Sequence, residues 1–145
     1  MTGPALDRFV EAQADTFERA LSELRSGRKK SHWMWFVFPQ IAGLGRSSTA
    51  RHYAIASLDE ARSFLSHSIL GPRLLTASEA VLSWEGERSA VAIFGTTDAM
   101  KLRSSMTLFE QAGENPVFAQ VLDAFYAGKR DAATLSILAE GPAHG

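Results

Sequence analysis

Cysteine is absent from this sequence of 145 residues. Its absence excludes disulfides, thiolate catalysis and cysteine-ligated zinc. An excess of charge of one sign is lacking as well, because the formal net charge is only −1. Non-specific nucleic-acid binding draws on many contacts from lysine and arginine to phosphates. Nucleic acid is therefore not the expected partner, although the run Arg28-Lys29-Lys30 forms a local basic patch.

Long apolar runs are also missing. No window approaches the roughly 18 apolar residues that span a membrane, and acidic residues interrupt the N-terminal segment, unlike a secretory signal. We therefore expect a soluble cytoplasmic protein. Hydrophobic residues make up 46% of the chain and charged residues 21%, proportions typical of globular proteins. The length predicts one domain over residues 1–145, with its core at about 6–138 and short flexible termini. The sequence does not determine the oligomeric state, and a monomer is slightly favoured.

Helical periodicity dominates the sequence. Leu6, Phe9, Phe17 and Leu24 share one face at a spacing of 3.6 residues, which predicts a first helix that Gly27 ends. Further helices are predicted from periodicity, caps and turn residues at about 49–55, 58–66, 72–84, 90–94, 99–111, 117–127 and 132–138.

Several cap patterns set these boundaries. Ser57 with Glu60 three residues later forms a capping-box pattern. Ser89 is a suitable N-cap for the short helix at 90–94, and Thr97 or Asp98 is one for the longer helix that follows.

The aromatic segment HWMWFVF, residues 32–38, has the composition of a buried strand or of a buried helix. No other segment offers it a strand partner, and Pro39 ends a helix as readily as a strand. We predict a short buried helix. The fold class is then all-α, a compact and irregular domain of seven or eight helices.

This aromatic segment is also the first candidate site, because polar residues flank it. Lys30 precedes it, His32 is its first residue and Gln40 follows it. A histidine among aromatic residues serves as a general base or a ligand, or simply bonds a backbone carbonyl. Trp33 and Trp35 lie about 200° apart on a helix, so either the helix is packed on two sides or one ring borders a cleft. Packing alone is the simpler interpretation.

The following loop is the second candidate. Gly43, Gly45, Arg46 and Ser47 precede a helix start, a layout that presents backbone N–H groups and a guanidinium to an anion. The loop matches neither the P-loop nor the dinucleotide fingerprint. A plain connecting loop is the alternative.

The segment DAMKLRSSMTLF provides a third polar cluster. Asp98, Lys101 and Ser105 lie close to one helical face, while apolar neighbours such as Met100 are assigned to packing. A serine–lysine hydrolase has the order S-x-x-K, whereas Lys101 here precedes Ser104. The histidines are too dispersed for a metal-binding spacing, so we predict neither a metal nor a cofactor.

Four segments together carry a resemblance to a known family: GRKKSHWMWFVFPQIAGLGRSS, LGPRL, IFGTTDAMKLRSSMTLF and VLDAFYAGKRDAATLSIL. They resemble the domain-of-unknown-function family number 1810, over about residues 6–138. The resemblance implies an all-α fold and brings no established activity or catalytic residue. Bacterial members sometimes carry the label calpastatin, which does not fit, because such an inhibitory peptide is disordered whereas this composition folds.

The sequence contains no complete catalytic signature, and several functions stay open. We favour a binding module for a small anionic or nucleotide-like ligand, in a pocket shared by Lys30, His32, Gln40 and the helix of Asp98. An enzyme on a glycosidic or ADP-ribose-type bond is an alternative and needs a carboxylate in the cleft. An interaction factor without a pocket is a second alternative.

Overall fold

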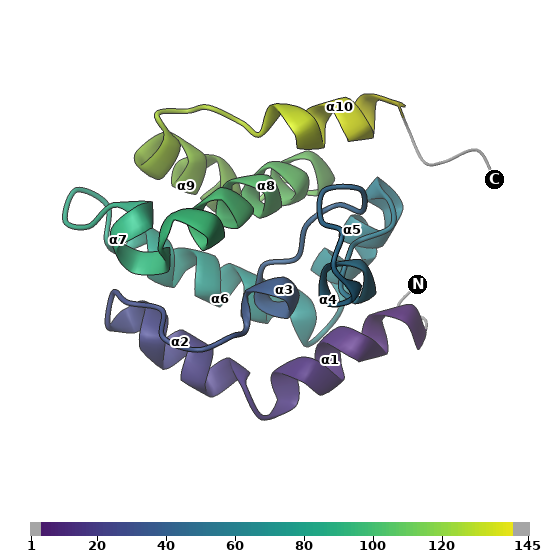
Figure 1. The fold of residues 1–145 in the computed structure, drawn as a ribbon, viewed down its shortest axis with the longest axis horizontal. Helices are drawn as coiled ribbons and strands as arrows, with labels where there is room; N and C mark the ends of the chain where they lie inside the picture. The colour runs from purple at the N-terminus through teal and green to yellow at the C-terminus, as the bar shows by residue number, and fades with distance from the viewer. Residues whose placement is uncertain (1–3, 141–145) are drawn as a thin grey trace.

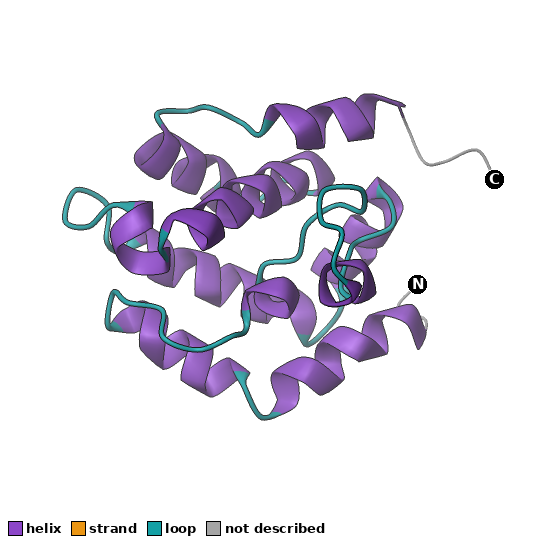
Figure 2. Ribbon diagram, in the orientation of Figure 1, coloured by secondary structure: helices purple, strands orange, loops and turns teal. Residues whose placement is uncertain are grey.

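The computed structural model describes residues 4–140, which form helices joined by loops (Figure 1). Between these residues there is no β-strand (Figure 2), only an isolated parallel bridge between Ile41 and Ile55. The elements are η1 (Pro4–Leu6), α1 (Asp7–Ala14), α2 (Phe17–Arg25), α3 (Met34–Val37), α4 (Ser48–His52), α5 (Leu58–Ser66), α6 (Leu70–Leu82), α7 (Ala90–Phe94), α8 (Thr96–Ala112), α9 (Val117–Tyr126) and α10 (Ala132–Glu140).

The all-α prediction is confirmed, but the predicted number of helices is too low. Ten α-helices lie within residues 4–140, rather than seven or eight. The predicted flexible termini lie outside the described residues. None of the described helices is both long and apolar enough to cross a membrane.

The first predicted helix is in fact two helices. The chain breaks at Asp15 and Thr16, and α1 and α2 leave this point in different directions (Figure 1). Side chains of both residue types compete with the helix for backbone hydrogen bonds. The break lets α1 pack against α3 while α2 packs against α6. Gly27 follows α2 with a φ of 77°, the left-handed conformation predicted for the end of this segment.

Two of the predicted caps are confirmed. The Ser57 hydroxyl accepts a hydrogen bond from the Glu60 backbone N–H at 3.1 Å, and the Ser89 hydroxyl accepts one from Ala92 at 3.0 Å. The cap predicted for α8 is wrong. This helix begins at Thr96, directly after Gly95 with a φ of 80°, so Thr97 and Asp98 lie inside its first turn.

The helix predicted at 49–55 also differs, because α4 ends at His52. The residues after it return to the chain that follows α3. Ile55 donates its backbone N–H to the Gln40 carbonyl at 2.8 Å, and Ala42 donates to the Ile55 carbonyl at 2.8 Å. Backbone pairing with a distant segment thus replaces the last helical turn, and the pattern of residues 49–55 contains no sign of that partner.

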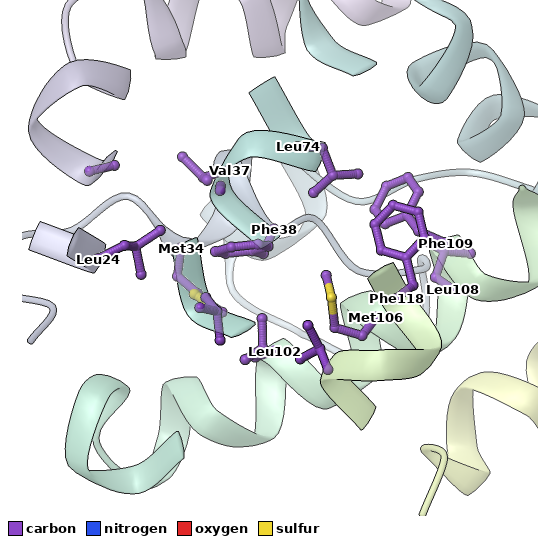
Figure 3. Close-up of a cluster of buried hydrophobic side chains, with 14 of the residues drawn as sticks. Leu24, Met34, Val37, Phe38, Leu74, Leu102, Met106, Leu108, Phe109 and Phe118 are labelled. Atoms are coloured by element: carbon purple, nitrogen blue, oxygen red, sulfur yellow. The ribbon is translucent and has the colours of Figure 1, made fainter. Parts of the chain in front are cut away.

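The core gathers side chains from helices that are distant in the sequence. Figure 3 shows Leu24 of α2, Met34 of α3, Leu74 of α6 and Phe118 of α9 around the buried side of α8. The aromatic segment contributes in the same way. The predicted burial of Trp33 and Phe38 is confirmed, since their exposed fractions are 0% and 1%.

The contact between α5 and α6 depends on a glycine in the first turn of α6. A Cβ atom at Gly71 would lie 2.1 Å from the carbonyl oxygen of Leu65, so the backbone itself would have to move. We expect Gly71→Ala to lower the free energy of unfolding by about 2 kcal/mol, as overpacking against rigid structure does. Urea denaturation followed by circular dichroism measures this loss.

Gly113→Ala is the matched control, because Gly113 also faces Leu65. There the added Cβ meets only the Cδ1 end of the leucine side chain, at 2.6 Å. A side-chain end moves more easily than backbone, so we expect a loss below about 1 kcal/mol. Equal losses for the two variants would argue against the α5–α6 contact as described.

Candidate functional site

A pocket of about 390 Å³ lies between the loop after α3, the first half of α8 and the start of α10. Its volume falls within the range of small-molecule sites. The lining consists of Gln40, Leu44, Gly45, Thr97, Met100, Lys101, Arg103, Ser104, Asp131 and Ala133. Three elements thus meet around one hollow.

One stripe of α8 forms the helical wall. Thr97, Met100, Lys101 and Ser104 follow the spacing i, i+3, i+4, i+7, which places them on one face. The predicted stripe of Asp98, Lys101 and Ser105 is rotated by about one residue, or roughly 100°, from this face. Met100 was assigned to packing, and that assignment is wrong. Its exposed fraction is 68%, which leaves a flexible apolar side chain at the pocket edge.

Charged groups in the lining come from α8 and from the turn before α10. Lys101 and Arg103 are the cations and Asp131 is the only carboxylate in the lining. Asp131 is already engaged. It accepts hydrogen bonds from the Thr134 backbone at 3.0 Å and from the Thr134 hydroxyl at 2.6 Å, and it lies 3.5 Å from Arg103. The lining therefore carries a net charge of +1.

Lys101 is held by two weak partners. Its ammonium lies 4.5 Å from the centre of the Trp35 ring, within cation–π range. It also lies 3.8 Å from Asp98, a long ion pair. Asp98 is much closer to Lys29, at 2.9 Å, and the Lys29 side chain is only 8% exposed. Because Asp98 is shared, Lys101 keeps much of its capacity to meet an anion.

The opposite wall is the loop from Gln40 to Gly45, which the hydrogen bonds to Ile55 close at its base. A smaller hollow of about 10 Å³ lies behind it, beside Trp35 and Tyr53, and Gln40 and Gly45 line both spaces. This volume corresponds to roughly one water molecule. A Cβ at Gly45 would lie 2.6 Å from the Cβ of Ala50, so the loop packs tightly against α4.

The structure brings some of the predicted site residues together and separates others. Gln40, Gly45 and Lys101 line the pocket. Trp35, which the sequence placed either in the core or beside a cleft, is half-buried and lines the smaller hollow. The predicted residues outside the lining of the pocket are Lys30, His32, Trp33, Gly43, Arg46, Ser47, Asp98 and Ser105.

The reasons for the separation differ. Lys30, His32 and Arg46 are exposed. Trp33 and Ser105 are 0% exposed and have no surface for a ligand. The Ser105 hydroxyl is the one buried side-chain polar atom, within the described part of the chain, that lacks a hydrogen-bond partner.

Asp98 pairs with Lys29 at 2.9 Å, and the other two of these residues serve the loop. Ser47 caps α4 by accepting a hydrogen bond from the Ala50 N–H at 3.1 Å. Gly43 faces α10, where an added Cβ would lie 3.3 Å from Ile137.

The aromatic segment is anchored by a carboxylate that the sequence reasoning missed. Glu23, in the last turn of α2, accepts hydrogen bonds from the backbone of Lys30 and Ser31, from the Ser31 hydroxyl and from the Trp33 ring N–H, at 2.6–3.0 Å. Burial alone would raise the pKa of Glu23, but these hydrogen bonds outweigh it and lower the pKa to about 2. The signal was present in the sequence: an acidic residue between Leu21 and Leu24 on an otherwise apolar face.

Other missed residues belong to the pocket itself. Arg103 and Asp131 lie 28 positions apart, a separation at which no local pattern links them. Thr97 and Met100 were recognisable only once the rotation of α8 was known. In residues 4–140 no group of three or more histidine, aspartate and glutamate residues is placed to hold a metal ion.

Comparisons with known proteins identify the family. No curated protein matches the chain. The crystal structure of the conserved hypothetical protein Rv1873 from Mycobacterium tuberculosis is similar, with a TM-score of 0.90 and 49% identity over 92% of this chain and 96% of that chain. The family model described as "Protein of unknown function (DUF1810)" matches residues 4–138. The resemblance found in the sequence is thus confirmed, and the chain belongs to the DUF1810 family.

Proposed function

We propose that this protein binds a small anionic, nucleotide-like ligand in the pocket between the Gln40–Gly45 loop, α8 and α10. The observation that carries the proposal is that Lys101 and Arg103, both from α8, line one hollow of about 390 Å³ whose other lining residues include Leu44, Met100 and Ala133. Such a combination of a mostly apolar cleft and a few convergent polar groups is typical of small-molecule sites.

The apolar residues support a ligand with a planar or hydrophobic body. Leu44 comes from the loop, Met100 from α8 and Ala133 from α10, so apolar side chains are present on all sides of the hollow. Met100 is flexible and adapts to the shape of a ring. Burial of an otherwise exposed methionine against a ligand also adds hydrophobic stabilisation.

The cations support an anionic group on that body. The Arg103 guanidinium offers several N–H donors, and an arginine fork binds phosphate or carboxylate with two parallel hydrogen bonds. Its ion pair with Asp131, at 3.5 Å, leaves further donors of the guanidinium available. Lys101, two positions earlier in α8, adds a second positive charge to the lining. A phosphate between the two is the arrangement we propose.

The geometry favours binding over catalysis. A glycosidic or ADP-ribose-type reaction needs a carboxylate that faces the substrate. Asp131, the carboxylate of the lining, holds the first turn of α10 and pairs with Arg103. Asp98, the candidate from the sequence, pairs with Lys29 and does not line the pocket. Neither is placed as an uncommitted acid or base.

The proposal predicts that ligand binding depends on the two cations. A thermal-shift screen of nucleotides, sugar phosphates and ADP-ribose should contain compounds that raise the melting temperature of the wild type, because a ligand that binds only the folded state stabilises it. Calorimetry should show that Lys101→Gln and Arg103→Gln each weaken these compounds by at least about tenfold, as loss of a charge-assisted hydrogen bond does.

Two variants serve as controls. Arg62→Gln removes an exposed cation from α5, with a side chain 55% exposed, and His32→Ala changes an exposed residue outside the lining. Both should bind as the wild type does. If no compound shifts the wild type, or if the controls weaken binding as much as Arg103→Gln does, the pocket is not an anion site.

A further inference from the structure

The backbone of Gln40 is held from both sides. Its carbonyl accepts the N–H of Ile55 at 2.8 Å, and the next residue, Ile41, forms the parallel bridge to the same Ile55. Phe38, two positions earlier, is buried in the core. The side chain of Gln40 therefore starts from a fixed point, which is the requirement for a residue that selects a ligand by its hydrogen bonds.

The side-chain amide has no such anchor within the protein. Gln40 is half-buried and lies at the boundary between the pocket of about 390 Å³ and the small hollow beside Trp35. Among the described residues, the main chain of Gln40 forms a hydrogen bond and its side chain forms none. A glutamine amide offers one carbonyl acceptor and two N–H donors. A partly buried amide is best satisfied by a partner inside the pocket.

Gln40 and the two cations occupy different walls. Gln40 belongs to the loop that follows α3, whereas Lys101 and Arg103 belong to α8. A ligand held by its anion on the α8 wall therefore presents its body to the loop wall. The edge of that body then faces Gln40. The donors and acceptors on this edge determine whether it forms hydrogen bonds with the amide.

We propose that Gln40 is a specificity-determining residue that selects ligands whose ring edge carries a hydrogen-bond donor beside an acceptor, such as a lactam, a carbonyl beside a ring N–H. Such an edge pairs with a glutamine amide through two hydrogen bonds in opposite directions. This inference rests on the proposed function and narrows its ligand class to nucleotides whose base carries a donor beside an acceptor, such as inosine, uridine or adenosine monophosphate. An aromatic anion without that edge fills the pocket and leaves the amide unpaired.

The test compares two ligands that differ in the edge alone. Inosine monophosphate carries the lactam, and purine riboside monophosphate has the same ring, sugar and phosphate without it. Calorimetry on the wild-type protein should show tighter binding of inosine monophosphate by at least about tenfold, because a site built for a hydrogen bond rejects an analogue that lacks it. Gln40→Leu should lower the affinity for inosine monophosphate to that of purine riboside monophosphate.

Gln40→Glu provides a second readout, since it keeps the size of the side chain but replaces its donors with an acceptor. It should weaken inosine monophosphate and leave the melting temperature of the free protein close to that of the wild type. Equal affinity of the two nucleotides for the wild type overturns the selection by Gln40 and leaves the anion site intact. Absence of binding for both, together with an empty thermal-shift screen, overturns both proposals.

Discussion

Replacing Trp33 by alanine is expected to lower the free energy of unfolding by about 4 kcal/mol, the cost of deleting a large buried aromatic side chain. The Trp33 ring is 0% exposed and packs against Phe38 and Phe94, with ring centres 6.2 Å and 6.4 Å away. Its ring N–H donates to Glu23 at 2.9 Å, and the Lys29 ammonium lies 5.1 Å from the ring centre. Truncation removes all of these contacts at once.

Urea denaturation followed by circular dichroism measures this loss, and two variants separate its causes. Trp33→Phe keeps an aromatic ring but loses the N–H donor, so it should cost less than the alanine variant. Trp35→Ala changes a half-buried ring two positions away and should cost about half as much as Trp33→Ala. A loss below about 1 kcal/mol for Trp33→Ala would contradict the burial described for this ring.

Local signals were sufficient for much of the fold. Ser57 and Ser89 each cap a helix where the sequence predicts one, because capping depends on residues only three positions apart. The break at Asp15 and Thr16 was missed for the opposite reason. The apolar face continues in register across these two residues, and the different packing partners of α1 and α2 are determined by tertiary structure.

The candidate site was harder to predict than the fold. The sequence analysis selected Gln40, Gly45 and Lys101, which line the pocket. It also selected Ser105, which is buried on α8 next to the pocket residue Ser104. On a helix the difference between a pocket residue and a core residue is one position, or about 100°. The rotation of α8 follows from its packing against α5, α7, α9 and α10, and of these α5 is distant in the sequence.

The aromatic segment illustrates the same division between core and site. Trp33 and Phe38 are core residues, as their composition predicts. Trp35, on this single helical turn, contacts Lys101 instead: the Lys101 ammonium lies 4.5 Å from the centre of its ring. The run from Trp33 to Gln40 therefore contributes to the core through Trp33 and Phe38 and to the pocket lining through Gln40.

Glu23 connects the first helices to this segment. A carboxylate in the last turn of a helix is disfavoured by the helix dipole, so local preference does not explain its position on α2. It is retained by the donors of Lys30, Ser31 and Trp33, which it holds against the end of α2. The basic run Arg28-Lys29-Lys30 is thereby fixed next to the buried tryptophan.

Replacing Glu23 by alanine is expected to lower the free energy of unfolding by about 3 kcal/mol near neutral pH, because buried donors lose a charged acceptor. Acid should produce a related loss in the wild type. The pKa of Glu23 falls from 4.5 in the unfolded chain to about 2 in the folded protein, so its contribution is complete above about pH 5 and disappears as the pH falls toward 2.

The matched variant for this pH dependence is Glu23→Gln, which keeps the size of the side chain and has no group that titrates. Urea denaturation at a series of pH values should show a gap in the free energy of unfolding between wild type and variant of about 3 kcal/mol at pH 7, the value that corresponds to the depressed pKa. The gap should close steadily between pH 5 and pH 2, since the wild-type carboxylate becomes neutral there. A gap that stays constant over this range would mean that Glu23 is held by its shape and not by its charge.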